Sequence, residues 1–214
     1  MKKNIILALI FSFFLISCAG KKDLFDDYNL SDKAWLERII NNIKKDRLDD
    51  ADNDYISLYS EHINSELLKS AMLILANAHS NEGEYLLANY YLDEYLKLFG
   101  SKQNYEWIKY LKIKNAYSSL KLPNRNQYFL LDVIKLIQDF KFEYPNSQYI
   151  FLIRHYESKL ELANYILNKD ILKLYKRMGY EQSVEVYKQR LENSNFNDIK
   201  VIKGYLPWYR KIFE

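Results

Sequence analysis

The segment "SNEGEYLLANYYLDEYLKLF", residues 80–99, decides the fold of this 214-residue chain. It begins with a short polar stretch that contains a glycine, which is typical of a turn, and continues with apolar residues at spacings of three and four. Those spacings place the apolar side chains on one face of a helix and predict an amphipathic helix over 85–99. The apolar positions are Leu87, Ala88, Tyr91, Leu92, Tyr95 and Phe99.

The same periodicity recurs on both sides of this segment. It predicts further helices over 33–46, 48–61 and 65–80, joined by short polar turns. The chain contains only 5 glycines and 3 prolines, so we do not expect many β-hairpins or a glycine-rich loop that cradles phosphate. An all-α array of helical hairpins is the fold class that these features predict.

The hairpins share a repeating register. Ala51-x3-Tyr55 matches Ala88-x3-Leu92, and in a tetratricopeptide unit a small residue stands where the two helices approach most closely. The remaining anchors are Trp35 and Met72, which precede their alanines by the same offset, and the later pairs Val133-x3-Ile137 and Ser183-x3-Tyr187. The pattern predicts a tetratricopeptide-like α-solenoid of about four helical-hairpin units, with an irregular helical bundle as the alternative.

The N-terminal residues have the layout of an export signal. Two lysines precede an apolar run over positions 5–16. This run is shorter than the ~20 residues of a membrane-spanning helix. "LISC" at 15–18 then resembles a lipobox. We therefore predict a lipoprotein signal peptide over 1–17, lipidation of Cys18, and a polar tether over 18–29. The alternatives are an uncleaved anchor, or an ordinary signal peptide in which the cysteine occurs by chance.

The single cysteine of the chain agrees with export as a lipoprotein. An exported protein meets an oxidising compartment, and one cysteine cannot form an internal disulfide. Acylation would use Cys18, and several acyl chains anchor a protein stably. Ala19 follows the cysteine, and the absence of an aspartate there favours sorting to the outer membrane. The predicted location is the outer membrane, with the domain facing the periplasm.

Composition and motifs argue against several classes of function. The formal net charge of +3 falls to +1 when Lys2 and Lys3 leave with the signal peptide, so no basic excess favours nucleic acid. The three histidines, His62, His79 and His155, are isolated in sequence and are interpreted as core or surface residues rather than metal ligands. No nucleophile motif occurs. We expect no enzyme activity, no metal and no cofactor.

Three segments carry a resemblance to a known family. They are "QNYEWIKYL" at 103–111, "YPNSQY" at 144–149 and "LELANYILNKDILKLYKRMGYEQSVEVYKQRLE" at 160–192. Together with the lipobox, they resemble the BamD/ComL family of tetratricopeptide lipoproteins, which belong to the β-barrel assembly machinery. The resemblance covers residues 30 to 196.

The resemblance implies a non-enzymatic scaffold at the outer membrane. Such a scaffold would bind the periplasmic domains of BamA and unfolded outer-membrane proteins. The alternative is another tetratricopeptide interaction lipoprotein, such as a pilus-secretin pilotin, a cell-wall-associated coordinator or a competence factor. The sequence departs from the family at the ends of the first two units, which lack proline, and in place of the fifth unit, where "GYLPWYRKIFE" stands at 204–214. The partner-binding side chains of the family are therefore not carried over to this chain.

Candidate partner-binding residues come from the helices and from the C-terminal tail. Trp107 and Tyr110 share a helix face and could form the wall of a peptide-binding groove or pack between units. Asn77 is expected on the first helix of the second unit, where an amide can bind a peptide backbone. We assign 30–204 to the tetratricopeptide-like domain and 205–214 to an aromatic tail. In that tail, Trp208 and Tyr209 could cap the last unit or dock a partner.

Overall fold

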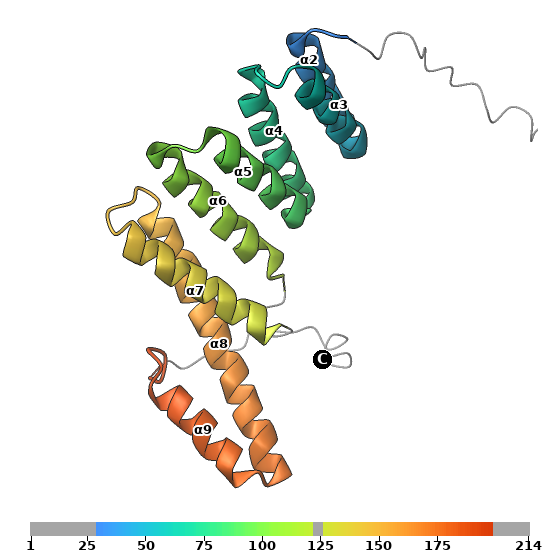
Figure 1. The fold of residues 1–214 in the computed structure, drawn as a ribbon. Coiled ribbons are helices and arrows are strands. Elements are labelled where there is room, and N and C mark those ends of the chain that lie inside the picture. Colours follow the sequence, from blue (N-terminus) through green and yellow to red (C-terminus); the bar gives the residue numbers. More distant parts are fainter. Residues whose placement is uncertain (1–28, 122–125, 199–214) are drawn as a thin grey trace, which may run out of the picture. The chain divides into compact units, whose positions relative to one another are not determined.

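The computed structural model describes residues 29–121 and 126–198, and every regular element in these ranges is an α-helix (Figure 1). The eight helices follow one another as four consecutive hairpins. Their bounds are α2 Asp32–Ile43, α3 Leu48–Glu61, α4 Leu67–Glu82, α5 Tyr85–Phe99, α6 Lys102–Ser119, α7 Gln127–Glu143, α8 Ile150–Met178 and α9 Glu181–Glu192. The predicted all-α, tetratricopeptide-like fold is confirmed. None of the helices in the described ranges is long and apolar enough to cross a membrane.

The predicted helices agree closely with the observed ones. The expected bounds 48–61 and 85–99 coincide with α3 and α5, and α4 begins and ends slightly further along the chain than expected. The expected helix over 33–46 is wrong at its end, because α2 stops at Ile43. Asp46 has a positive φ of 54°, and the backbone N–H of Arg47 donates to the carbonyl of Asn42 at 3.0 Å, so the chain turns there.

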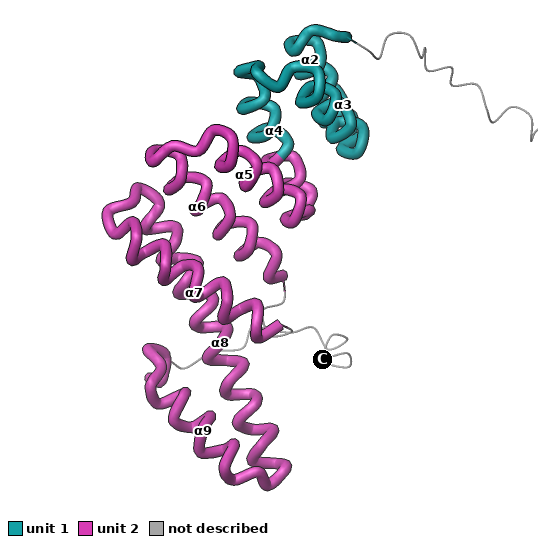
Figure 2. The backbone as a smooth tube through the Cα atoms, in the orientation of Figure 1, with its two compact units in different colours: residues 1–75 teal, residues 76–214 magenta. Residues whose placement is uncertain are grey.

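The chain divides into two compact units between Leu75 and Ala76 (Figure 2).

In the first unit, α2 packs against α3 through an apolar core. Helix α2 begins at a serine cap, where the N–H of Ala34 donates to Ser31 Oγ at 3.2 Å. Such a cap satisfies one of the backbone N–H groups that the first turn of a helix leaves unpaired. The side chains of Trp35, Ile39 and Leu58 are at most 1% exposed. Ala51 is fully buried as well, which fits the predicted position of closest helix approach.

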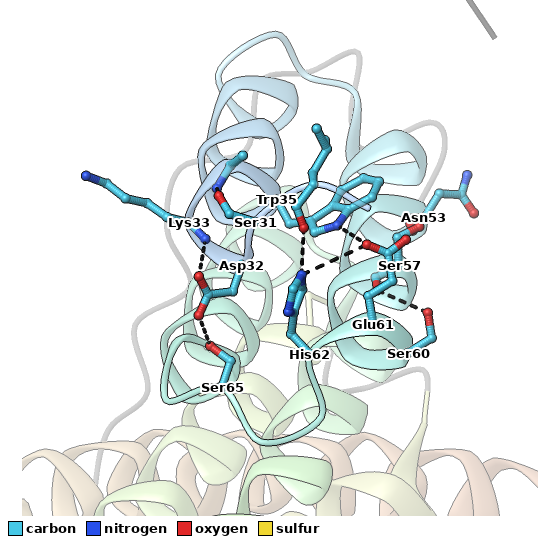
Figure 3. Close-up of polar contacts among 12 residues, drawn as sticks. Ser31, Asp32, Lys33, Trp35, Asn53, Ser57, Ser60, Glu61, His62 and Ser65 are labelled. Atoms are coloured by element: carbon cyan, nitrogen blue, oxygen red, sulfur yellow. Dashed lines mark hydrogen bonds and ion pairs between the residues drawn. The ribbon is translucent and has the colours of Figure 1, made fainter. Parts of the chain in front are cut away.

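Polar contacts fix the ends of this hairpin (Figure 3). Trp35 Nε1 donates to Glu61 Oε2 at 2.7 Å, so the indole N–H has a partner inside the packed pair. Ser65 Oγ donates to Asp32 Oδ2 at 2.6 Å, and His62 Nε2 lies 2.6 Å from the carbonyl oxygen of Leu30. These contacts tie the start of α2 to the residues that follow α3.

In the second unit, the turn between α4 and α5 is formed by a glycine and a buried histidine. Gly83 has a φ of +83°, which residues with a side chain rarely adopt. His79 is 1% exposed, lies 2.6 Å from Glu84 Oε2 through Nδ1, and stacks on Tyr91 with ring centroids 5.6 Å apart. His79 is therefore a core histidine that holds the turn.

Helices α6, α7 and the first part of α8 share one apolar core. Its central side chains are Ile113, Leu130, Val133, Ile137, Phe140, Ile153 and Leu160. Figure 1 shows α7 beside the first part of α8 and α9 beside its last part, and both pairs are in contact. Helix α8 is 29 residues long and is capped after Met178 by Gly179, which has a left-handed φ of 75°. Glycine is the usual residue at such a helix end. No residue of α9 is buried, although Tyr187 contacts Tyr175 of α8 with ring centroids 5.5 Å apart.

Candidate peptide-binding groove

A groove of about 790 Å³ lies within the second unit, formed by the start of α5, by α6 and by α7. Its floor consists of apolar side chains that also belong to or contact the shared core. These are Ile113, Ala116, Phe129 and Phe140. The groove is therefore an opening onto the apolar interior of the hairpins, bounded by helices on both sides.

The walls of the groove carry apolar side chains that the fold leaves exposed. Leu86 is 89% exposed and Leu87 44% exposed, whereas Ala88 in the same turn of α5 is fully buried. Leu136, on the opposite wall, is 48% exposed on α7. A contiguous exposed apolar surface of this kind marks a binding site more often than scattered single residues do.

Charged residues line the edge of the groove. Lys109 Nζ donates to Glu143, and this hydrogen bond raises the pKa of Lys109 above its usual value. Lys112 Nζ pairs with Asp93 Oδ1 at 2.6 Å. Glu84 and Asp139 also line the groove, so both signs of charge are present along its edge.

This arrangement favours binding over catalysis. An apolar floor accepts apolar side chains of a polypeptide, and a mixed charged edge can pair with polar groups on either side of them. Within the described ranges, no group of three His, Cys, Asp or Glu side chains is placed to hold a metal. The groove thus combines an apolar floor with charges of both signs along its edge.

Two stacked tyrosine pairs join α6 to the start of α8. The rings of Tyr110 and Tyr149 lie 4.3 Å apart, and those of Tyr117 and Tyr156 also lie 4.3 Å apart. Burial, and after it the neighbouring hydroxyl of Tyr110, raises the pKa of Tyr156 to about 12. The hydroxyl of Tyr156 is therefore neutral at physiological pH, and the pairs act as packing between the third and fourth hairpins.

The candidate residues from the sequence lie at several places. Asn77 is exposed on α4, and Trp107 is half-buried on α6. Tyr110 is half-buried and its ring stacks on that of Tyr149, and its role in binding a partner stays a prediction. Trp107 and Tyr110 are not among the lining residues of the groove, which takes Lys109, Lys112, Ile113, Ala116 and Ser119 from α6. Cys18, Trp208 and Tyr209, together with the segments 1–28 and 199–214, lie outside the described residues.

Sequence reasoning missed the groove walls. Leu86 and Leu87 follow Tyr85 in an unbroken apolar run, and only one face of such a run can enter the core of an amphipathic helix. The position of Leu86 could have predicted its exposure, because Leu86 lies outside the three and four spacing that the other apolar residues of α5 follow. Lys109 and Lys112 carried no comparable signal, since lysines on a helix are usually solvated.

Comparisons with known proteins identify the family to which the chain belongs. Residues 30–192 match the protein family described as "YfiO: Outer membrane lipoprotein". The chain is also similar to the outer membrane protein assembly factor BamD of Helicobacter pylori. The two are 36% identical over 197 residues, which cover 92% of this chain and 90% of the relative.

Proposed function

Because the chain belongs to the YfiO family of outer membrane lipoproteins, we propose that it is a non-enzymatic scaffold of β-barrel assembly that binds unfolded outer-membrane proteins and the periplasmic domains of BamA. In this role the protein captures a client polypeptide and holds it near the barrel-inserting subunit. The work is done by preorganised shape, because ordering a binding surface in advance lowers the cost of association.

The groove between α5, α6 and α7 is the observation that best supports the binding of client proteins. Strands of outer-membrane barrels alternate apolar and polar side chains, so an unfolded client presents an apolar side chain at every second residue. The exposed Leu86, Leu87 and Leu136 offer such side chains a surface, and the floor of the groove is already apolar. The mixed charges of Lys112, Glu84 and Asp139 can meet the polar side chains in between.

Photocrosslinking tests the groove. Benzoylphenylalanine is placed at Leu136 in one variant and at Tyr128 in a matched control. Both positions are on α7 and exposed, Tyr128 by 86%, but only Leu136 lines the groove. A urea-unfolded outer-membrane protein, diluted into the purified lipid-free chain, should crosslink at position 136 and much less at position 128. Equal crosslinking at the two positions, or none, would remove the groove from the proposal.

Co-purification tests the partner. The wild-type lipoprotein, isolated from detergent-solubilised outer membrane, should bring BamA with it. Recovery of a secretin or of a cell-wall protein in place of BamA would instead support the alternative, a tetratricopeptide lipoprotein of another pathway.

The anchor is part of the same proposal and rests on the "LISC" segment. Cys18→Ser removes the sulfur that would be acylated, so we expect loss of palmitate labelling and release of the protein from the outer-membrane fraction. The membrane fractions of labelled cells give the result directly. Palmitate uptake and outer-membrane location that persist in the variant would place the anchor elsewhere.

A further inference from the structure

A polar cavity lies between α8 and α9 in the second unit, with the start of α7 on one side, and it shares no lining residue with the groove. It consists of two adjoining spaces of about 210 Å³ and 380 Å³. The residues that line both spaces are Asn164, Asn168, Arg190 and Asn193. We call these two spaces the asparagine cavity.

Two amide oxygens in the asparagine cavity have no hydrogen-bond donor. Asn168 is 7% exposed and Asn164 is half-buried. Neither Oδ1 atom finds a donor among the residues that the structure describes. A buried acceptor without a partner destabilises a fold, and most buried polar groups in proteins are paired. These two oxygens are therefore acceptors that the described chain leaves open.

The spacing of the two asparagines matches an extended backbone. They are one i, i+4 step apart on one helix, which corresponds to about 6 Å along the helix axis. In a β-strand, the backbone groups that point to the same side recur every second residue, which is about 6.6–6.8 Å. Each carboxamide can accept from a backbone N–H through its oxygen and donate to a backbone carbonyl through its nitrogen. Two such side chains on one helix face could therefore pair with alternate residues of one strand.

The charges around the cavity favour a neutral ligand. Arg190 lines both spaces and Glu161 lines one of them, so the two formal charges are of opposite sign. A peptide backbone carries both donors and acceptors and no net charge, so it fits this site better than an anion or a cation does.

We propose that the asparagine cavity binds the backbone of an extended polypeptide strand, independently of its sequence, and that this strand belongs to an unfolded outer-membrane protein. The choice of client rests on the proposed function, whereas the strand chemistry rests on the two unpaired oxygens and their spacing. The groove would then recognise apolar side chains of the client, and the asparagine cavity would recognise its main chain.

A labelled peptide tests the proposal on the full lipid-free chain. The probe is a fluorescein-labelled decapeptide of alternating threonine and valine with a lysine at each end, and binding is followed by fluorescence anisotropy. Two further peptides carry N-methyl groups on alternate amides, one in each register. N-methylation removes the N–H donors on one side of the strand, so methylation in one register should weaken binding by about tenfold or more, with a smaller effect in the other register. Equal affinity for all three peptides would overturn the proposal.

Substitutions in the protein give an independent result. Asn168→Leu and Asn164→Leu replace the carboxamides with apolar side chains of similar size. Each should weaken peptide binding by about tenfold, and Asn168→Leu should also raise the melting temperature, because it removes an unpaired buried acceptor. The matched control is Asn53→Leu at an exposed position of α3, which should change neither quantity. Unchanged peptide binding in both cavity variants would contradict the proposal.

Two further comparisons identify the occupant. A chain that ends at residue 198 should bind the peptide as the full chain does. Binding that appears only in the shortened chain would show that residues 199–214 occupy the cavity, and the proposal would then be wrong. Crosslinking at position 136 reports on the groove separately from the cavity. If the Asn168→Leu variant loses peptide binding but still crosslinks the client at position 136, both the groove and the asparagine cavity are supported as binding sites. Loss of the Leu136 crosslink alone would contradict only the proposed function of the groove.

Discussion

The α2–α3 hairpin and the α8–α9 hairpin use their polar side chains in opposite ways. In α2–α3, the buried carboxylate of Asp54 accepts from Arg38 at 2.9 Å and from Asn42 at 2.7 Å. In α8–α9, the buried amide oxygens of Asn164 and Asn168 have no donor within the described chain. The first hairpin pairs its polar groups across its two helices, and the second leaves acceptors open.

The two hairpins also differ in apolar packing, which is more extensive in α2–α3 than in α8–α9. Helix α3 contributes buried residues to its pair, whereas α9 contributes none. A hairpin whose apolar and polar groups are both paired internally gains stability but has nothing left to offer a ligand. The α8–α9 hairpin retains hydrogen-bonding capacity, at a cost in stability that a bound strand could offset. Substitutions in both hairpins test this difference.

Replacing Trp35 with alanine should have the largest effect. The variant loses a fully buried indole and its hydrogen bond to Glu61. The free energy of unfolding should therefore fall by about 3–5 kcal/mol. Urea unfolding followed by circular dichroism measures the loss. The control is Ile56→Ala, at a position of α3 that is 62% exposed. This exposed substitution should cost no more than about 0.5 kcal/mol. Similar losses in the two variants would show that the hairpin core contributes little.

Replacing Asp54 with alanine should rank second. Asn42 and Arg38 would lose a shared acceptor inside the hairpin. We expect a loss of about 2–4 kcal/mol, because both donors lie in a partly desolvated place. The same unfolding measurement applies, with Asn53→Ala at the neighbouring exposed position as the control. A loss below about 1 kcal/mol would mean that the paired polar groups do not account for the difference between the hairpins.

Tyr187→Ala in α9 should have a smaller effect. Its ring is half-buried against Tyr175 and lies under Arg190, whose guanidinium carbon is 4.8 Å from the ring centroid. An aromatic pair of this kind contributes about 0.5–1.5 kcal/mol. Hydrogen exchange should become faster along α9, while α2 and α3 keep their protection. Val186→Ala, next to it on the exposed face, should leave the exchange unchanged. Faster exchange in α2 as well would contradict the separate behaviour of the two hairpins.

The smallest effect should come from Glu161→Gln, and it should depend on pH. Burial raises the pKa of Glu161 in the folded state, so the charged form disfavours folding at neutral pH. The variant should therefore melt at a higher temperature than the wild type at pH 7. This gain should disappear as the pH falls below the ordinary glutamate pKa of 4.5, where both side chains are neutral.

Asp32→Asn provides the opposite case in the first hairpin. A hydrogen bond from Ser65 lowers the pKa of Asp32, so its charged form stabilises the folded state above the ordinary aspartate pKa of 3.8. The asparagine variant should melt below the wild type at pH 7 and approach it as the pH falls through the lowered pKa. If both variants changed the melting temperature in the same direction at pH 7, the two hairpins would not differ in the way described here.

The sequence was sufficient for the features that depend on one helix at a time. The three and four spacing predicted α3 and α5 to the residue, and both repeat alanines, Ala51 and Ala88, are fully buried. The end of α2 was missed because Asp46 adopts a left-handed φ, which the apolar pattern does not report. The "LISC" segment predicted the lipoprotein anchor and the family resemblance predicted a role in β-barrel assembly, neither of which periodicity alone could provide.

The features that need several helices could not be predicted. Helix α6 contacts α5, α7 and α8, so its apolar residues face several neighbours and do not form a single stripe. Spacing identified Trp107 and Tyr110 as a pair but could not show that Tyr110 meets Tyr149, or that the groove lies at other positions of α6. The unpaired oxygens of Asn164 and Asn168 depend on what α7 and α9 place around them, and no local pattern records this.

Helix α8 also limits how this chain can change in evolution. Its first part packs with α7 and its last part with α9, and it runs for 29 residues without a loop. At the rise of an α-helix this length corresponds to about 43 Å. Repeat arrays gain and lose units by recombination at the loops between them. A break between the α7-facing and α9-facing parts of α8 would fall inside a continuous hydrogen-bonded helix and expose both packed faces. Natural variants of this chain should therefore vary in length at the α3–α4 and α5–α6 connections, which separate hairpins, and keep the third and fourth hairpins as one inherited block.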